Sequence, residues 1–316
     1  MGYDIVTFGP LVVEIEGGKI GQKFNEAGVY YGPFSSGDTP IFINAAARLG
    51  AKTAMIGAVG GDAFGECALR KLKENGVDVS QVQISKDRYT GSTFVIYYED
   101  GSRKFLYHLD GSGSIDFDPD AYDPGCLADA KWVHFTGFSM EASEKYVRAC
   151  YKALEYLGPQ TKVSFDPNIR PEIYTPEQIK EMCDPILRRA DVVLPSGDEA
   201  KLFTGAASVD EGCRILSDGG KKLVVLKRGE NGSRFYQGDE IIDVPSFKTT
   251  EVDPTGAGDT YDAALITGFC EGMSIYEAGR FANAAGAYAV TKKGPMEGQA
   301  TRAQIDELLA SGRTEI

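Results

Sequence analysis

The sequence predicts an α/β fold in three layers, α/β/α, with a mostly parallel central sheet and a small β-sheet lid. Two patterns predict it. Short, almost continuously apolar runs alternate with amphipathic helical stretches through most of the chain, as in a parallel sheet covered by helices on both faces. Two other segments alternate apolar with polar residues, as antiparallel hairpins with one exposed face do.

The strand candidates are bounded by Gly, Pro or charged residues, and their continuous apolar character indicates that both of their faces are buried. They span residues 5–8, 53–58, 132–135, 163–165, 192–194 and 223–226. The helix candidates carry apolar residues at helical spacing and span residues 41–49, 64–75, 143–157, 175–189, 209–218, 259–271 and 274–292.

The two alternating segments lie at about residues 11–37 and 88–109, and the second contains the turn Glu99-Asp100-Gly101-Ser102. A small sheet without helices of its own suits a lid over an active site or a contact between subunits. No repeat, low-complexity tract or Pro-rich linker divides the chain. We therefore expect residues 1–316 to form a single domain.

Composition excludes several classes of protein. Among 316 residues, 33 Lys and Arg stand against 46 Asp and Glu, and the net charge of −13 argues against a general binder of nucleic acid or of anionic membranes. The sequence shows no signal-peptide pattern at the N-terminus and no apolar run long enough to span a bilayer, so we expect a cytoplasmic protein. The cysteines are far apart and form no CxxC pair, which favours reduced thiols over a disulfide or zinc framework.

The most informative stretch is Asp253-Pro254-Thr255-Gly256-Ala257-Gly258-Asp259, a Gly-rich loop directly before a predicted helix. Backbone amides at the start of a helix can converge on an anion, with the helix dipole behind them. The carboxylate of Asp259 would repel a bound anion, so its position here indicates a catalytic role. The alternative is a Gly-rich loop and an acidic cap without a ligand.

Phosphoryl transfer requires both features of this loop. Fixed amide donors stabilise the charge on the phosphoryl group, and a carboxylate accepts the proton of the attacking hydroxyl. We therefore expect Asp259 to be a general base, with the amides of Gly256, Ala257 and Gly258 as the anion site.

The same seven residues resemble the carboxyl-terminal signature D-T-x-G-A-G-D of the ribokinase/phosphofructokinase-B family of carbohydrate kinases, and the resemblance runs over nearly the whole chain. It implies a ribokinase-like fold, ATP and Mg²⁺ as cofactors, and the roles given above for Asp259 and the anion site. A monovalent cation such as K⁺ is a further option that the resemblance leaves open.

The resemblance also implies a nucleotide side of the site. Lys227 to Gly232 follow a strand and look like the family's nucleotide-binding turn, and Asn283 falls near the adenine. The implied nucleotide contacts are Lys227, Gly229, Gly232, Thr255, Gly256, Gly258 and Asn283. For Lys227, a solvated lysine at a strand end is an equal alternative. Glu199 matches the acid of an N-x-x-E element that holds magnesium through water, although Ser196 replaces its Asn.

The acceptor side departs from the family pattern. Ile41 stands at the usual substrate Asn, with Asn44 three positions later. Asp166-Pro167-Asn168-Ile169-Arg170 resembles the D-x-N-x-R element of fructokinases and 2-keto-3-deoxygluconate kinases, in which Arg170 would hold phosphate or substrate oxygens; a structural turn is the alternative. The expected acceptor contacts are Glu14, Gly37, Asp38, Asn44, Tyr107, His108 and Asp259.

Deoxygluconate kinases tend to carry Tyr-Tyr-Arg in the lid, where this chain has Tyr107-His108-Leu109. Without that Arg, burial of a sugar carboxylate is unfavourable. The chain is similar to the fructokinase, tagatose kinase and 2-keto-3-deoxygluconate kinase branches, and we expect a ketohexose kinase of tagatose or fructose type. The alternatives are a 2-keto-3-deoxygluconate kinase, a nucleoside kinase of the same fold, and a sugar-binding regulator without catalysis. We further expect a homodimer formed through the lid.

Overall fold

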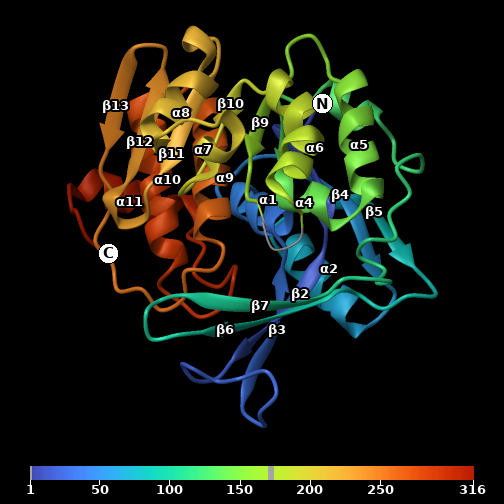
Figure 1. The fold of residues 1–316 in the computed structure, drawn as a ribbon. Coiled ribbons are helices and arrows are strands. Elements are labelled where there is room, and N and C mark those ends of the chain that lie inside the picture. Colours follow the sequence, from blue (N-terminus) through green and yellow to red (C-terminus); the bar gives the residue numbers. More distant parts are fainter. Residues whose placement is uncertain (1, 170–173) are drawn as a thin grey trace.

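The structure, a computed structural model, describes residues 2–169 and 174–316, and two sheets organise it (Figure 1). The larger sheet has nine strands in the order β13-β12-β11-β10-β9-β8-β1-β4-β5. The strands from β11 to β5 pair in parallel, and the hairpin of β12 and β13 adds antiparallel strands at one edge. Their bounds are β1 Ile5–Pro10, β4 Thr53–Gly60, β5 Asp78–Ser85, β8 Trp132–Thr136, β9 Lys162–Asp166, β10 Val192–Val193, β11 Leu223–Lys227, β12 Ser233–Gln237 and β13 Glu240–Val244.

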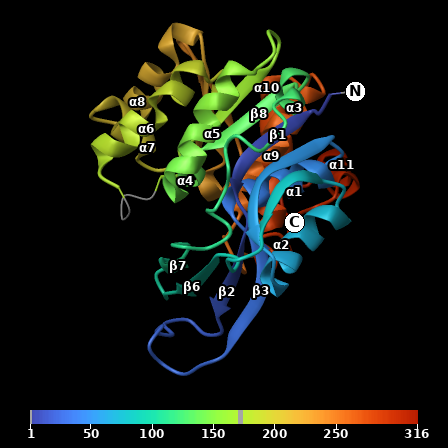
Figure 2. The same cartoon turned by 90° about the vertical axis from the view of Figure 1, so that its right-hand side faces the viewer.

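Helices cover both faces of this sheet, so the predicted three-layer fold is confirmed. Figure 2 shows α4 to α8 on one side and α1, α2, α9 and α11 on the other. The helices are α1 Asp38–Arg48, α2 Ala63–Glu74, α3 Gly125–Ala128, α4 Gly137–Ala142, α5 Glu144–Glu155, α6 Pro176–Arg189, α7 Glu199–Thr204, α8 Val209–Leu216, α9 Ala257–Cys270, α10 Ile275–Ala289 and α11 Arg302–Ser311.

Each face of the sheet has its own hydrophobic core, which explains the continuous apolar runs. In β1, Ile5 belongs to the core under α1 and α9, whereas Val6 and Phe8 belong to the core under α5 and α6. Because alternate side chains of a strand point to opposite faces, a strand between two cores needs apolar residues at every position. All six predicted strands lie in the central sheet for this reason.

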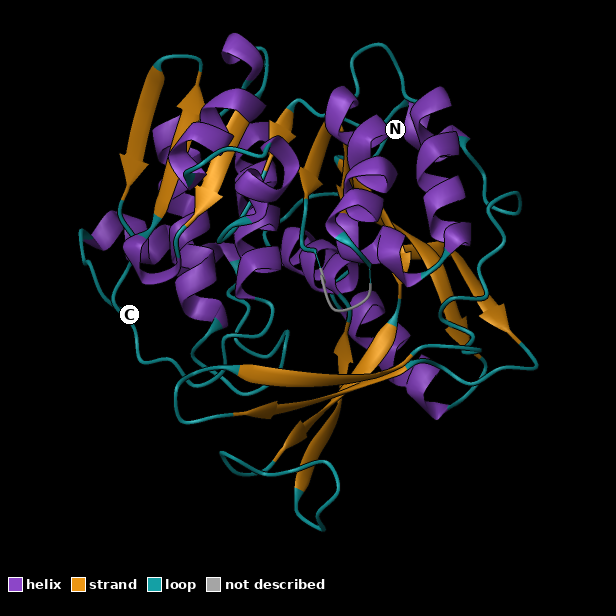
Figure 3. Ribbon diagram, viewed as in Figure 1, coloured by secondary structure: helices purple, strands orange, loops and turns teal. Residues whose placement is uncertain are grey.

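A second sheet of four strands, β3-β2-β6-β7, forms the lid below the carboxyl ends of the central strands (Figure 3). It consists of β2 Val12–Gly17, β3 Tyr30–Ser36, β6 Ser92–Tyr97 and β7 Arg103–His108, all within the two segments predicted for it. β2 pairs with β3 and β6 with β7 in antiparallel fashion, whereas β2 and β6 are parallel.

The structure adds elements that the apolar pattern did not predict. β5 and the hairpin of β12 and β13 mix polar and apolar residues because they lie toward the edges of the sheet and are only partly buried. α1 begins at Asp38, three residues before the predicted start, because Thr39 and Pro40 form its first turn.

Among the described residues, no helix combines the length and apolarity needed to span a membrane.

Candidate active site

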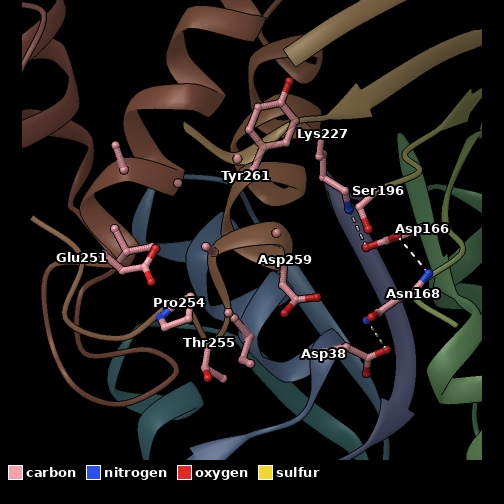
Figure 4. Close-up of a pocket in the computed structure, with 18 of the residues that line it drawn as sticks. Asp38, Asp166, Asn168, Ser196, Lys227, Glu251, Pro254, Thr255, Asp259 and Tyr261 are labelled. Atoms are coloured by element: carbon pink, nitrogen blue, oxygen red, sulfur yellow. Dashed lines mark hydrogen bonds and ion pairs between the residues drawn. The ribbon is translucent and has the colours of Figure 1, made fainter. Parts of the chain in front are cut away.

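A cavity of about 1130 Å³ lies between the lid and the carboxyl ends of the central strands. Its wall includes Asp38 of α1, Asp166 at the end of β9, Lys227 at the end of β11 and Asp259 of α9 (Figure 4). Glu14 of β2 also lines it. Ligands of open α/β sheets bind at this edge, where the strand ends and the loops after them leave a crevice. The cavity is therefore the candidate active site.

The Gly-rich loop forms one wall of the cavity and leads into α9. Gly256 is the N-cap with φ 77°, a left-handed conformation that favours glycine. A Cβ atom there would lie 2.5 Å from the carbonyl oxygen of Pro295 and 3.0 Å from Cγ2 of Ile41. Because a glycine N-cap has no side chain to bond the first-turn amides, the Gly258 amide is left available for a ligand.

Asp259 lies in the first turn of α9, beside these amides. Figure 4 shows its carboxylate projecting into the cavity, on the side where Asp38 lies. The structure thus places the Asp259 carboxylate beside a glycine-capped helix start, and the binding of an anion there stays a prediction.

Asp253 anchors the start of the same loop. Its side chain is buried, and Oδ1 accepts hydrogen bonds from the Thr255 amide (2.9 Å) and from the Tyr97 hydroxyl of the lid (2.6 Å). Oδ2 accepts a hydrogen bond from the Gly294 amide at 2.8 Å. Burial raises the pKa of Asp253, but these hydrogen bonds outweigh it and hold the pKa below its usual value. The carboxylate therefore stays charged and holds two segments of chain together.

Lys227 lines the cavity, and its ammonium is already paired. Nζ lies 2.8 Å from Oδ2 of Asp166 and 2.8 Å from Oδ2 of Asp262, with both carboxylates almost completely buried. Burial lowers the pKa of Lys227, but the two carboxylates outweigh it and raise the pKa above its usual value. Neither of the two interpretations from the sequence, a solvated lysine or a phosphate contact, includes this buried ion triad.

Glu199 is the first residue of α7, and its carboxylate is occupied by the chain. Oε1 accepts a hydrogen bond from the Ile169 amide at 3.1 Å, and Oε2 accepts one from the Ser196 amide at 2.7 Å. Burial raises the pKa of Glu199. Ser196, and not Glu199, lines the cavity, so any contact of Glu199 with a metal would need an intervening water, as the resemblance implies.

The structure brings all the predicted nucleotide contacts to the same cavity: Lys227, Gly229, Gly232, Thr255, Gly256, Gly258 and Asn283. Asn283 is buried, and its Nδ2 donates to Ser233 Oγ and to the Val244 carbonyl, each at 3.2 Å.

Two of the predicted acceptor contacts do not reach the cavity, whereas Glu14, Gly37, Asp38 and Tyr107 do. Asn44 lies on another face of α1, where it is fully buried and bonded to Gln299 at 2.6 Å and to Asn75 at 2.9 Å. His108 lies on the opposite face of β7 from Tyr107, with its ring 5.6 Å from that of Phe94. Arg170 is outside the described residues.

Asp38 is held rigidly at the cavity wall. Its Oδ1 accepts hydrogen bonds from the Thr39 amide (2.8 Å) and from Ser139 Oγ (3.0 Å). Its Oδ2 accepts from Thr136 Oγ1 at 2.5 Å and from Asn168 Nδ2 at 3.5 Å. The side chain is thus oriented before any ligand binds.

Sequence reasoning missed a number of lining residues, among them Arg103, Phe105 and Phe138. Arg103 and Phe105 share a face of β7 with Tyr107, so the period of two along that strand could have revealed them. Phe138 follows the end of β8, and no local pattern marks it. The lid therefore does bring an arginine to the cavity, although not at the position where deoxygluconate kinases carry theirs.

Comparison with known proteins gives one family. The model of the pfkB family carbohydrate kinases matches residues 42–302. Fructokinase-2 of Zea mays is 30% identical over 318 residues, which cover 97% of this chain and 94% of that protein. Probable fructokinase-2 of Arabidopsis thaliana is 30% identical over 300 residues, covering 92% of this chain and 91% of that protein.

Solved structures agree. A putative ribokinase II from E. coli, in its apo form, has a TM-score of 0.92 and 33% identity, with 98% of this chain and 99% of that chain covered. The same protein in complex with ATP and Mg²⁺ has a TM-score of 0.91 and 32% identity over the same shares. Because the family model spans most of the chain and these relatives align over nearly its whole length, the chain belongs to the pfkB family and is an ATP-dependent carbohydrate kinase.

Proposed function

We propose that this kinase transfers the γ-phosphate of ATP to a hydroxyl of a ketohexose of fructose or tagatose type. The observation that supports this most is the position of Asp259 beside the amides of the α9 start, in one cavity with Glu14 and Asp38. Asp259 takes the proton of the attacking hydroxyl, and the amides of Gly256, Ala257 and Gly258 stabilise the charge on the phosphoryl group.

A polyhydroxylated acceptor suits the other wall of the cavity. Glu14 offers a carboxyl group and Asp38 a carboxylate to sugar hydroxyls, and Asn168 offers an amide. Phe105, Tyr107 and Phe138 line the same cavity, and the Tyr107 and Phe138 rings lie 5.7 Å apart. Aromatic rings beside hydrogen-bonding groups match a sugar, which has an apolar face and a rim of hydroxyls. The curated relatives in the comparison are fructokinases, which supports the ketohexose class.

A sugar acid such as 2-keto-3-deoxygluconate is the second candidate, and Arg103 is the observation that favours it. This lid residue lines the cavity and could pair with a carboxylate. Two features favour the neutral sugar instead. The Arg103 guanidinium already donates to Thr255 Oγ1 at 3.4 Å. Burial raises the pKa of Glu14, and the nearby charge of Arg103 offsets part of that rise, so Arg103 already faces an acidic group of the protein.

ATP and Mg²⁺ fit the residues present. The Gly258 amide and the helix start face the cavity, as a terminal phosphate requires. Among the described residues, no cluster of His, Cys, Asp or Glu is arranged to hold a metal by itself. Magnesium would therefore be held mainly by phosphate oxygens and water molecules, and Glu199 would contact the ion through a water. When bound, the ion would neutralise phosphate charge.

A coupled ADP-release assay tests the acceptor class, using fructose, tagatose, psicose, ribose, 2-keto-3-deoxygluconate and nucleosides. The proposal expects the highest kcat/KM with a ketohexose, and Arg103→Gln should change that value only a few-fold. A sugar acid or a nucleoside with the highest kcat/KM would overturn the ketohexose assignment. A sugar acid as substrate would also make Arg103→Gln costly, by about a hundredfold or more, because its carboxylate would lose its partner.

Three further properties belong to the proposal. Repeating the assay with K⁺ replaced by a bulky organic cation tests whether a monovalent cation is needed. All six cysteines are free, which fits a reducing cytoplasm.

The lid exposes Ile20, Val29, Tyr31 and Leu106, an apolar surface suited to a homodimer of single kinase domains. Light scattering on Leu106→Asp tests it, with loss of a wild-type dimer as the expected result and a monomeric wild type as the contrary one.

A further inference from the structure

The lid meets the Gly-rich loop at the hydroxyl group of Tyr97. Tyr97 ends β6, and its Oη lies 2.6 Å from Asp253 Oδ1 and 2.6 Å from Thr255 Oγ1. Asp253 is 2% exposed and Thr255 is 7% exposed, so the junction excludes most water. A hydrogen bond to a carboxylate is stronger in such surroundings than in water.

The hydrogen atoms in this junction have one consistent arrangement. Arg103 can only donate, and Nη1 donates to Thr255 Oγ1 at 3.4 Å. The carboxylate of Asp253 can only accept, so the Tyr97 hydroxyl donates to it. Thr255 therefore donates its hydroxyl hydrogen to Tyr97 Oη. The chain of donors runs from Arg103 through Thr255 and Tyr97 to Asp253, and Tyr97 is the member that bonds the carboxylate.

Two members of this chain, Tyr97 and Arg103, come from the same lid hairpin. Tyr97 and Arg103 are directly paired across β6 and β7. One hairpin position thus supplies two groups to the loop, and a shift of the hairpin would move both.

Asp253 also bonds the backbone around Gly256, the start of the proposed anion site. Its Oδ2 accepts the Gly294 amide, and the next residue, Pro295, packs its carbonyl oxygen against Gly256. Its Oδ1 also accepts the Thr255 amide, directly before Gly256. The backbone on both sides of Gly256 is therefore held by the one carboxylate that Tyr97 bonds.

We propose that Tyr97 is a positioning residue that couples the lid to the anion site, since its hydroxyl orients Asp253 and Thr255 and thereby the amides of Gly256, Ala257 and Gly258. The inference rests on the proposed role of these amides. Without the hydroxyl, Thr255 loses its acceptor and can turn toward Asp253, and the loop is no longer tied to the lid. Tyr97 itself does not line the cavity.

Tyr97→Phe tests the proposal because it removes only the oxygen. The expected result is a kcat lower by about ten- to a hundredfold, the range for one charge-assisted hydrogen bond, with the acceptor KM within about threefold of wild type. Amide hydrogen exchange of residues 255–258 should become faster in the folded variant. Tyr98→Phe is the matched control, since Tyr98 is the next residue and is 37% exposed. Its kcat should stay at the wild-type value.

Coupling with Thr255 gives a second measurement. In a cycle of Tyr97→Phe, Thr255→Val and the double variant, the losses of kcat should not multiply, because both single changes break the same chain of hydrogen bonds. Fully multiplicative losses would overturn the proposal. So would a Tyr97→Phe enzyme that keeps its kcat per folded molecule, whether or not its melting temperature falls.

The outcome is separable from that of the proposed function. An active Asp259→Asn enzyme would refute the general base and leave the Tyr97 coupling intact. An unchanged kcat in Tyr97→Phe would refute the coupling and leave the assignment of Asp259 untouched.

Discussion

Lys227 at the end of β11 lies 2.8 Å from Asp262 of α9, one helical turn after Asp259. The same ammonium holds Asp166 at the end of β9. This buried ion triad joins two central strands to the helix that presents the proposed general base. Its members are far apart in the sequence, and the pairing has consequences that can be measured.

Removing the buried cation should destabilise the fold. Lys227→Met leaves the buried side chains of Asp166 and Asp262 without their cation, and we expect a loss of about 3–5 kcal/mol in the free energy of unfolding. Urea denaturation measures it. Lys221→Met is the control, since that side chain is 77% exposed, and its effect should stay within about 0.5 kcal/mol. A Lys227→Met protein of normal stability with a raised KM for ATP would instead support a phosphate contact.

Removing the proposed base should abolish turnover without preventing binding. Asp259→Asn keeps the shape of the side chain but cannot take the hydroxyl proton, and we expect kcat to fall by about 10²–10⁴-fold. Sugar binding, measured by calorimetry, should change little. Glu251→Gln is the control, because Glu251 is an exposed carboxylate that also lines the cavity. Near-normal turnover by Asp259→Asn would refute the assignment.

The two glycines that flank α9 should differ in their tolerance of a methyl group. Gly256 and Gly272 both have positive φ, 77° and 81°, so alanine is strained at either position by about 1–2 kcal/mol. Only at Gly256 would the new Cβ collide with backbone, 2.5 Å from the Pro295 oxygen. We expect Gly256→Ala to lose most activity and Gly272→Ala to retain it. Equal kcat values for the two variants would contradict this.

Neighbouring residues of β7 should affect the acceptor differently. Tyr107 lines the cavity, whereas His108 lies on the other face of the strand. Tyr107→Ala should therefore raise the acceptor KM by about tenfold or more, as expected for the loss of an aromatic contact. His108→Ala should leave KM within about twofold. Initial-rate kinetics with the best acceptor measure both KM values. A larger rise in KM for His108→Ala than for Tyr107→Ala would contradict the position of Tyr107 in the acceptor site.

Glu14 should make stability depend on pH. Burial, followed by the nearby charges of Glu16 and Asp253, raises its pKa from the ordinary 4.5 to about 8. Between these values the folded protein keeps a proton that the unfolded chain has released, so the free energy of unfolding falls as pH rises from 4.5 to about 8. Thermal melts of Glu14→Gln should show a shallower decline than wild type. Glu99→Gln, in the exposed lid turn, should match wild type; a Glu14→Gln profile as steep as wild type would contradict the assignment.

Sequence reasoning was accurate for features that depend on neighbouring residues in the chain, and it failed for features that depend on contacts between distant segments. The strand at 53–58 was predicted because a strand between two cores is apolar at every position, a property of the segment itself. β12 and β13 escaped prediction because they are partly exposed and their pattern is mixed. On α1, the family pattern places its substrate Asn at Ile41, and Asn44 was expected to contact the acceptor in its place, but the helix turns Ile41 toward the cavity and Asn44 toward Gln299.

The sequence by itself determined that a Gly-rich loop at residues 253–259 leads into a helix, because the glycines and the acid at 259 depend only on near neighbours; the helix begins at Ala257, two residues before the predicted start. It also determined the lid segments and the two-sided burial of the central strands. Only the tertiary structure decided that Lys227 is paired with two acids, that Arg103 enters the cavity, and that Tyr97 bonds Asp253. These contacts join strands and helices that meet only through the order of strands in the sheet, so no local pattern encodes them.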